Sequence, residues 1–409
     1  MTTSVILALA TGLPVIATKH SAFPDQVLDG KNGYLANEND YKDLAEKLLQ
    51  YLEHPELWRD MSRVARAHAL ATYDQKVLIG KQISHYERLA PGVKEVAFVV
   101  STFPVTSETW LINQIADLIE RGIDVRLYAF KKGTEENISQ RYFDHKMKDR
   151  TVYLEMPENL LARFFVAIPK FFHMLFVKPR ALLSVFSVRE HGANAYSGKL
   201  LFWTEPFLDL TADLIHCHFG TVANRFLAIR DALRLPQPFL TSFYGYDVSS
   251  VPQQKGAGYY DRLIKECPFF IVMSNNMKDR VAKLGFSREK MDPVPISEDV
   301  ESFPYKERVL EKDEKVRIVT VGRFVEKKGF DDLVRAMAIV KQKLGRPFVC
   351  AIIGGGELEG ELRALAKELD VEDVVSFEGF MKVQDVVQFL MKSHLYIQPS
   401  KTAKNGDME

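Results

Sequence analysis

The sequence has few cysteines and no excess charge of either sign. Three cysteines, Cys217, Cys267 and Cys350, occur among 409 residues, and they lie far apart in sequence. This spacing excludes a disulfide scaffold and a C-x-x-C zinc site, and it is typical of proteins in a reducing compartment. The 54 Lys and Arg residues balance the 54 Asp and Glu residues. We therefore expect a cytoplasmic protein and no nucleic-acid partner, since nucleic-acid binders carry a basic footprint.

Several nucleotide-binding and catalytic motifs are also absent. The chain has neither G-x-G-x-x-G nor a P-loop, which counts against a dinucleotide-binding or ATP-hydrolysing protein. It has no G-x-S-x-G, so a serine hydrolase of that type is not supported. It has no D-x-D, so we expect no metal bound by paired carboxylates and no other cofactor. We also expect no signal peptide and no apolar run of transmembrane length.

What the sequence does contain is an alternation of short apolar runs and helix-like segments. Apolar runs that alternate with helices predict parallel sheets, and hence an α/β fold. The helix after the run 95–101 is predicted to have Ser107 as its cap and to end at Gly122. The runs that we predict as strands are 13–18, 95–101, 124–130, 317–322, 348–353, 374–377 and 394–398.

The alternation divides into two α/β blocks, one at 94–305 and one that starts at 316. The second block reaches a polar loop at 399–409, where a helix should follow. The N-terminal segment supplies a helix at 2–12 that no strand precedes. We therefore predict a circular permutation in which 1–90 complete the block begun at 316–409. The alternative is that 1–90 form an independent small domain.

The segment 160–204 combines many aromatic residues with positive charge. It has six Lys and Arg residues and a single acidic residue, Glu190. Its charges and prolines argue against a membrane span. The composition is typical of a helix that lies on an anionic membrane surface. The alternative is a packed pair of helices with cationic edges.

The strongest local motif is VGRFVEKKGF at 321–330. A predicted strand ends at Gly322, a helix begins near Gly329, and Arg323 and Lys328 flank the turn. Because a helix N-terminus already favours anions, and Arg and Lys bind phosphate oxygens, this turn predicts a diphosphate site. The alternative is two solvated loop cations. Gly354 and its two glycine neighbours follow the next strand, where they would let a ligand approach the backbone.

Two motifs in the first block follow predicted strands. The residues His216 and His218 are a weak candidate for a metal site, because no further His or Cys lies at ligand spacing. They could instead be satisfied within the protein, or could face a ligand at the carboxyl end of a strand. Tyr244 and Asp247 follow another strand-like run. Asp247 is a candidate both for a helix cap and for a substrate contact.

Together these motifs resemble GT-B glycosyltransferases of family 4, close to the colanic-acid and exopolysaccharide type. The resemblance covers nearly the whole chain, in permuted order. It implies two Rossmann-like domains that face each other across a cleft, with 94–305 as acceptor domain and with 316–409 and 1–90 as donor domain. The segments that carry it are STFPVTSETW (101–110), IHCHFG (215–220), YGYD (244–247), VGRFVEKKGF (321–330), IIGGGEL (352–358), FEGF (377–380), PSKTAKNGDME (399–409) and ATGLPVIATKHSAFPD (10–25).

The resemblance implies a retaining, metal-independent transfer of a sugar from a nucleotide-diphosphate sugar to a lipid-linked or polysaccharide acceptor. It implies that Arg323 and Lys328 hold the diphosphate and that Glu409 contacts the donor sugar. The turn at Phe380 and Met381 would bind the base, beside glycines of the donor site. The residues implied to face the donor are Gly322, Gly354, Gly355, Phe380 and Met381. Those implied to face the acceptor or the cleft are Ser107, Glu108, His218, Tyr244 and Asp247.

Three positions depart from the family pattern. A second Glu of the family's E-x7-E motif falls on Leu7, and the family's usual histidine falls on Tyr244. The loop after Glu409 is divided in the permuted order, so reduced activity is expected. These departures favour a first alternative, a non-catalytic GT-B protein that binds a nucleotide or a partner. A second alternative is a sugar-nucleotide epimerase of the same fold.

Overall fold

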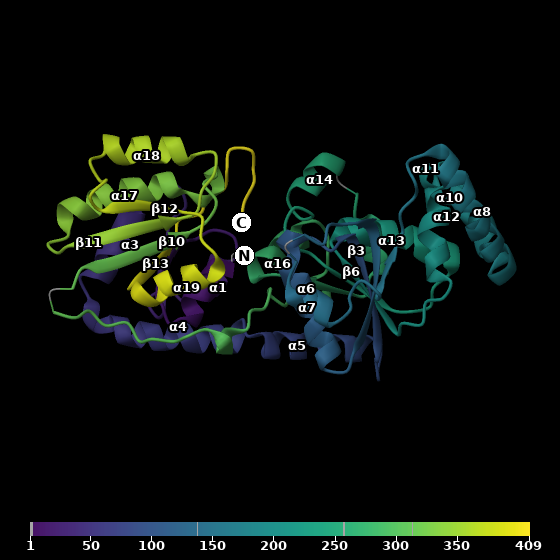
Figure 1. Cartoon of the computed structure of the whole chain (residues 1–409), viewed down its shortest axis with the longest axis horizontal. Coiled ribbons are helices and arrows are strands. Elements are labelled where there is room, and N and C mark those ends of the chain that lie inside the picture. The colour runs from purple at the N-terminus through teal and green to yellow at the C-terminus, as the bar shows by residue number, and fades with distance from the viewer. Residues whose placement is uncertain (1–2, 137, 257, 313) are drawn as a thin grey trace. The chain divides into compact units, whose positions relative to one another are not determined.

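The computed structural model describes residues 3–136, 138–256, 258–312 and 314–409. The chain forms two compact units, and each unit has a parallel sheet covered by helices (Figure 1). Unit 1 contains residues 3–78, 273–277 and 295–409 of the described chain. Unit 2 contains residues 79–272 and 278–294. The predicted α/β fold with two Rossmann-like domains is confirmed.

The sheet of unit 1 joins the two ends of the sequence. Its order is β12-β11-β10-β13-β1-β2, and each pair of neighbouring strands is parallel. In the pairing of β1 with β13, Val15 lies opposite Tyr396 and Ile16 lies opposite Ile397. Residues 1–90 are therefore not a domain of their own, while the permutation itself stays a prediction. The strands are β12 (Val375–Gly379), β11 (Phe348–Ile353), β10 (Val316–Val321), β13 (Leu395–Gln398), β1 (Val15–Thr18) and β2 (Gly33–Ala36).

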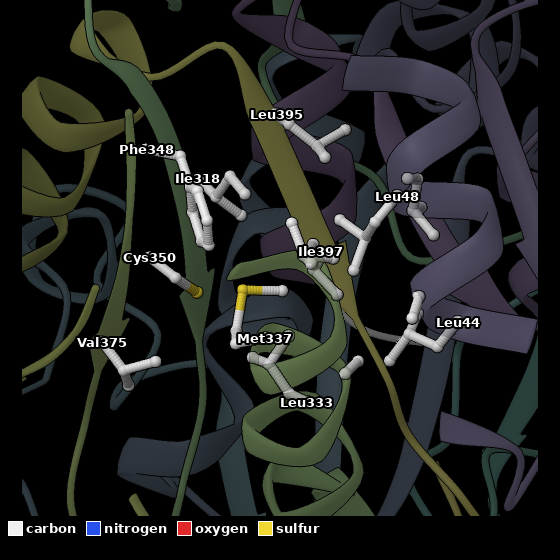
Figure 2. Packing of buried hydrophobic residues seen from close by; sticks show 14 of the residues in the cluster. Leu44, Leu48, Ile318, Leu333, Met337, Phe348, Cys350, Val375, Leu395 and Ile397 are labelled. Atoms are coloured by element: carbon white, nitrogen blue, oxygen red, sulfur yellow. The ribbon is translucent and has the colours of Figure 1, made fainter. Parts of the chain in front are cut away.

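Alternate strand residues of unit 1 enter two separate apolar clusters, one on each face of the sheet. Ile318 and Ile397 belong to one cluster, and Val319 and Tyr396 belong to the other. Figure 2 shows the first cluster, where strand side chains meet Leu44 and other residues of the covering helices. This doubly covered sheet explains why its strands are apolar on both faces. The covering helices are α3 (Tyr41–Leu52), α17 (Phe330–Lys343) and α18 (Glu359–Glu368) on this face, and α1 (Thr3–Ala10), α4 (Trp58–Thr72) and α19 (Val383–Lys392) on the other.

The unit boundaries differ from those expected from the sequence. The segment 295–305 was assigned to the acceptor block, but it belongs to unit 1. The guanidinium of Arg66 in α4 explains this, since it donates hydrogen bonds to the carbonyls of Ala10, at 2.6 Å, and Val300, at 2.8 Å. The other boundary falls within α5 (Gln75–Leu89), where unit 1 ends at Leu78.

Unit 2 has a seven-stranded sheet of order β5-β4-β3-β6-β7-β8-β9, again with parallel pairs. Two helices that follow its central strands are α6 (Thr109–Glu120) and α13 (Gly220–Leu233). The strands are β5 (Thr151–Tyr153), β4 (Asp124–Lys132), β3 (Glu95–Phe103), β6 (Leu214–His218), β7 (Phe239–Ser242), β8 (Phe269–Val272) and β9 (Met291–Pro293).

The segment 160–204 of unit 2 is helical throughout most of its length. Its first helix, α8 (Leu160–Val177), has 18 residues and continues through Pro169. Its mean hydropathy is 1.7 and only 6% of it is buried, so by length and composition it could cross a membrane. Arg163 and Lys170 interrupt its apolar residues, so the expectation that no uninterrupted apolar run reaches transmembrane length is not contradicted. Shorter helices follow: α9 (Pro179–Val185), α10 (Val188–His191), α11 (Ala193–Tyr196) and α12 (Lys199–Thr204).

Candidate functional site

The turns after β10 and β11 lie against each other in unit 1. The backbone N–H of Gly322 donates to the carbonyl of Ile353 at 3.0 Å, and that of Phe324 donates to the carbonyl of Gly355 at 2.9 Å. Gly354 has a φ of +138°, and a Cβ atom there would lie 1.9 Å from the Gly322 carbonyl oxygen. Only glycine fits this approach, so the glycine-rich turn serves the packing of two adjacent turns at the carboxyl edge of the sheet.

Lys328 is held at the start of α17 by a one-turn 3₁₀ helix, Glu326–Lys328. The next residue, Gly329, has a φ of +65°, and a Cβ atom there would lie 2.0 Å from the Pro399 carbonyl oxygen. The chain after β13 therefore packs directly on this turn, and the backbone N–H of Lys401 donates to the Lys327 carbonyl at 2.9 Å. Lys328 is 8% exposed as a result.

The two predicted phosphate ligands lie in different environments. Nζ of Lys328 lies 3.0 Å from Oε2 of Glu409, and both side chains are largely buried. The second carboxylate oxygen of Glu409, Oε1, is buried and has no partner among the described residues. Arg323 is exposed, and no hydrogen bond or ion pair engages its guanidinium within the described ranges. In this site Lys328 is therefore paired with Glu409, whereas the guanidinium of Arg323 is available to bind an anion.

A histidine and a carboxylate that the sequence analysis did not single out complete this edge. His20 follows β1 and Glu38 follows β2, and Nδ1 of His20 lies 3.1 Å from Oε2 of Glu38. The backbone N–H of Glu409 points to Nε2 of His20 at 3.3 Å, and the hydroxyl of Ser21 donates to the Glu409 carbonyl at 2.5 Å. Burial lowers the pKa of His20, against the opposing effect of Glu38. His20 therefore positions the Glu409 loop as a neutral ring.

Glu38 stays ionised beside this neutral histidine. Burial would raise the pKa of Glu38, but hydrogen bonds from the backbone of Thr402 and from His20 outweigh it and lower that pKa. Strand order is the signal that could have identified the pair. Both residues follow the carboxyl ends of neighbouring parallel strands, and such ends meet at one edge.

The predicted base-binding turn lies beside the glycine-rich turn. Phe380 is 79% exposed, yet its ring packs over Gly355, where an added Cβ atom would lie 2.7 Å from it. Met381 packs against the second apolar cluster of unit 1. The exposed ring of Phe380 is available for stacking on an aromatic ligand, in addition to the backbone contact expected there.

The position where the family's second Glu is expected contains no polar group. Leu7 lies in α1 and packs against the second apolar cluster. It therefore contributes apolar packing and offers no hydrogen bond to a ribose.

In unit 2, an aromatic cluster lies in the segments that follow β3, β6 and β7, with Trp110 in the first turn of α6. The rings of Trp110 and Tyr244 lie 4.4 Å apart, and those of Phe219 and Tyr244 lie 4.7 Å apart. The hydroxyl of Tyr244 lies 2.6 Å from Nδ1 of His218. Burial keeps His218 neutral, since it lowers the pKa of this ring well below its usual value. Nε2 of His218 is buried and has no partner in the described part of the chain.

The neighbouring His216 is satisfied inside the protein. Its Nδ1 lies 2.7 Å from the Tyr86 hydroxyl, and its Nε2 lies 2.7 Å from the Ser242 hydroxyl. Burial lowers the pKa of His216 to about 3, so the ring stays neutral. Among the residues that the structure describes, no three His, Cys, Asp or Glu side chains gather into a metal site.

Asp247 serves as a backbone cap inside unit 2. It is fully buried, and its carboxylate accepts hydrogen bonds from the backbone N–H groups of Gly220 at 3.1 Å, Tyr244 at 3.2 Å and Gly245 at 2.9 Å. The geometry favours the capping alternative over a substrate contact. Burial raises the pKa of Asp247, against the opposing effect of these backbone N–H groups.

The start of α6 differs from the predicted cap. The N-cap residue is Glu108, which makes no side-chain cap hydrogen bond, and Ser107 lies in a preceding 3₁₀ turn, Thr106–Glu108. The side chain of Ser107, predicted to face the cleft, lies outside what the structure describes. Burial raises the pKa of Glu108, whose carboxylate follows β3.

The two parallel sheets and the glycine-rich turns are consistent with the resemblance to GT-B glycosyltransferases. Residues 2–68 and 302–406 match the family model "Glycosyl transferases group 1". These two segments build the sheet of unit 1, so the match to this family model lies in unit 1. This match supports the predicted resemblance to glycosyltransferases for the part of the chain that it covers.

Two curated relatives match this chain well beyond unit 1. The amylovoran biosynthesis glycosyltransferase AmsK of Erwinia amylovora is 29% identical over 331 residues, which cover 77% of each chain. WcaL of Escherichia coli K12, whose name connects it with colanic acid biosynthesis, is 26% identical over 330 residues and 77% of each chain. Among solved structures, Anabaena HepE in complex with UDP aligns over 76% of this chain and 74% of its own, with 13% identity and a TM-score of 0.47.

Proposed function

We propose that this protein transfers a sugar, with retention and without a metal, from a nucleotide-diphosphate sugar to an acceptor in exopolysaccharide synthesis. One observation carries the proposal: Arg323 and Lys328 flank a glycine-walled turn at the N-terminus of α17. Such a helix end and two cations stabilise the charge that develops on a leaving diphosphate. The proposed role in exopolysaccharide synthesis is supported by the similarity to AmsK, whose name connects it with amylovoran biosynthesis.

Each residue of the unit 1 site then has a distinct task. Arg323, which is exposed and unpaired among the described residues, receives the diphosphate first. Lys328 exchanges its Glu409 partner for a phosphate oxygen, and the released carboxylate accepts hydrogen bonds from hydroxyls of the donor sugar. Phe380 stacks on the base beside Gly355. No side chain of this set requires a metal to neutralise the phosphate.

The acceptor is a lipid-linked or polysaccharide saccharide. The aromatic cluster of Trp110, Phe219 and Tyr244 supports this, because flat rings with nearby polar groups suit a sugar face. The apolar and cationic segment 160–204 supports the proposal that the protein binds the inner face of a membrane and acts on its acceptor there. In this proposal the protein acts in the cytoplasm, where nucleotide sugars are its donors.

A binding screen tests the diphosphate site first. The full chain is heated with UDP, GDP, ADP or their sugars, with and without EDTA. A raised melting temperature with one nucleotide, unchanged by EDTA, is expected, and it selects the donor for a transfer assay. A shift that EDTA abolishes would overturn the metal-free mechanism. The absence of a shift with any nucleotide would overturn the donor site.

Leu7 supports a second candidate, a non-catalytic nucleotide-binding protein. Its apolar packing removes the ribose contact that the family pattern expects. A sugar-nucleotide epimerase is the third candidate. Product analysis separates the three: transfer to acceptor, or slow donor hydrolysis, identifies the transferase; an epimerised nucleotide sugar identifies the epimerase; and nucleotide binding without turnover identifies the non-catalytic protein.

A further inference from the structure

A groove in unit 2 lies between α8 and the shorter helices that follow it. Its volume is about 440 Å³, which is the size of a site for one small ligand. Aromatic and aliphatic side chains form its walls, including Phe164, Ile168, Phe171, Phe186 and Phe202. Among the described residues that line it, Arg163 alone is charged. The groove therefore suits an extended apolar ligand and offers little to a polar one.

The outer surface of α8 is apolar as well. Phe176 is 80% exposed, Phe165 is 69% exposed and Leu161 is 72% exposed. This surface adjoins the groove, because Phe164 and Phe172 are both exposed and also line it. A contiguous apolar surface of this kind marks a site of interaction with a membrane or another protein.

The charges around this surface indicate whether it binds a second copy of the chain or an anionic lipid. Arg180, Arg189 and Lys199 are exposed, and no ion pair engages them in the part of the chain that the structure describes. A second copy of this chain would bring the same cations opposite them, because a symmetric dimer contact pairs identical patches. An anionic lipid instead supplies negative headgroups for the cations and hydrocarbon for the apolar surface.

The helix is fixed to unit 2 through its other polar side chains. Lys170 and His173 both contact the carboxylate of Glu205, and Nδ1 of His173 lies 2.7 Å from its Oε1. Nζ of Lys178 donates to the Leu233 carbonyl at 2.6 Å. In Figure 1, α8 and α12 lie side by side at the edge of unit 2, in agreement with their direct contacts. These anchors favour a helix that stays on the protein and presents a formed groove to the membrane.

We propose that the groove beside α8 binds one hydrocarbon chain of an anionic membrane lipid, whose headgroup lies beside Arg163, the charged residue in the groove lining. The chain enters from the bilayer on which the apolar surface of α8 rests. This site is independent of sugar transfer, since no residue of the unit 1 site takes part in it. It gives the protein a lipid-specific anchor in place of a spanning helix.

A soluble chain-like probe tests the groove without a bilayer. The full-length protein is titrated with cis-parinaric acid, a fluorescent fatty acid with an anionic carboxylate, below its micelle concentration. Saturable binding of one molecule per protein is expected. Ala167→Phe and Ile168→Trp, which fill the groove from α8, are each expected to weaken this binding at least tenfold while the melting temperature stays within a few degrees.

Phe176→Ser is the matched control, because Phe176 is exposed on the same helix but does not line the groove. It should leave parinarate binding unchanged and reduce flotation with phosphatidylglycerol vesicles. If the parent fails to bind one parinarate, or both groove-filling variants bind it as the parent does, the proposal is overturned. A dimer that dissociates in Phe176→Ser, or resistance of the membrane-bound protein to carbonate extraction, would also overturn it, in favour of self-association or a spanning helix.

Discussion

Lys328 and Glu409 form an ion pair at 3.0 Å in which each side chain is about nine-tenths buried. The carboxylate thus lies where the proposed donor phosphate would bind. A diphosphate must displace it, so the free site keeps its buried cation compensated until the ligand arrives. Isolated buried charges are costly, and this pair avoids one in the ligand-free protein.

Glu409→Gln removes the competing charge and provides a direct test of this exchange. We expect the variant to bind the selected nucleoside diphosphate about fivefold more tightly, a gain of about 1 kcal/mol, because the phosphate no longer displaces a carboxylate. The ligand-free protein should be less stable, since Lys328 loses its partner. Calorimetric titration and thermal unfolding measure both effects. Weaker nucleotide binding would contradict the exchange.

Arg323→Ala should weaken binding of the same nucleoside diphosphate by about 1.5–3 kcal/mol, the scale of a charge-assisted hydrogen bond. The melting temperature of the free protein should not change, because Arg323 is exposed and unpaired among the described residues. Lys343→Ala is the control, since Lys343 is an exposed cation at the opposite end of α17. Equal nucleotide affinities in the parent and Arg323→Ala would remove Arg323 from the diphosphate site.

Gly329→Ala should destabilise unit 1 by about 2 kcal/mol or more. The residue has a φ of +65°, and its new methyl group would lie 2.0 Å from a carbonyl oxygen that belongs to the loop after β13. Gly345→Ala is the matched control, because nothing lies within 4 Å of a Cβ atom there. Denaturant unfolding should separate the two variants clearly. Similar unfolding midpoints would show that the turn relaxes without cost.

Asp247→Asn distinguishes a cap from an acceptor contact. The amide nitrogen cannot accept hydrogen bonds, so at least one of the three backbone N–H groups loses its partner. We expect a loss of about 1–3 kcal/mol in the stability of unit 2. Tyr246→Phe in the same loop, which removes only one surface hydroxyl, should change stability by less than about 0.5 kcal/mol. Unchanged stability in Asp247→Asn, with reduced acceptor affinity, would restore the substrate role.

The carboxyl group of Glu298 predicts a pH dependence in unit 1. Burial, with a smaller effect of Asp299, raises the pKa of Glu298 from 4.5 to about 7. Between these values the folded state binds a proton that the unfolded state has released, so stability falls as pH rises. Relative to Glu298→Gln, the parent should lose about 1–3 kcal/mol between pH 5 and pH 8. Parallel stability curves for the two proteins would contradict this.

The sequence pattern was sufficient to locate the strands, because apolar runs buried on both faces leave an unambiguous signal. The run 348–353 and the strand Phe348–Ile353 have the same bounds. The pattern also predicted that the strand 13–18 belongs with the block begun at 316. This could be inferred because the helix predicted at 2–12 has no strand before it, while the block begun at 316 ends in a loop where a helix should follow.

The rest could not be predicted from local sequence. Helix α8 continues through Pro169, since a helix with exposed sides can accommodate one missing hydrogen bond. The pairing of His20 with Glu38 depends on which strands are neighbours, and that is a property of the sheet. The burial of Asp247 could not be predicted either, because its carboxylate accepts a hydrogen bond from Gly220, at a helix N-terminus 27 residues away in sequence.

The pairing of β1 with β13 delays the folding of unit 1 during synthesis. β1 leaves the ribosome early, but its partner strand emerges only after all of unit 2 has been made. At about 5–20 residues per second, the interval between Thr18 and Leu395 is about 20–75 s. Throughout that time the apolar residues of α1 and β1 have no completed sheet to cover them. Nascent chains of this protein should therefore depend on chaperones for their first segment, while unit 2 can fold ahead of unit 1.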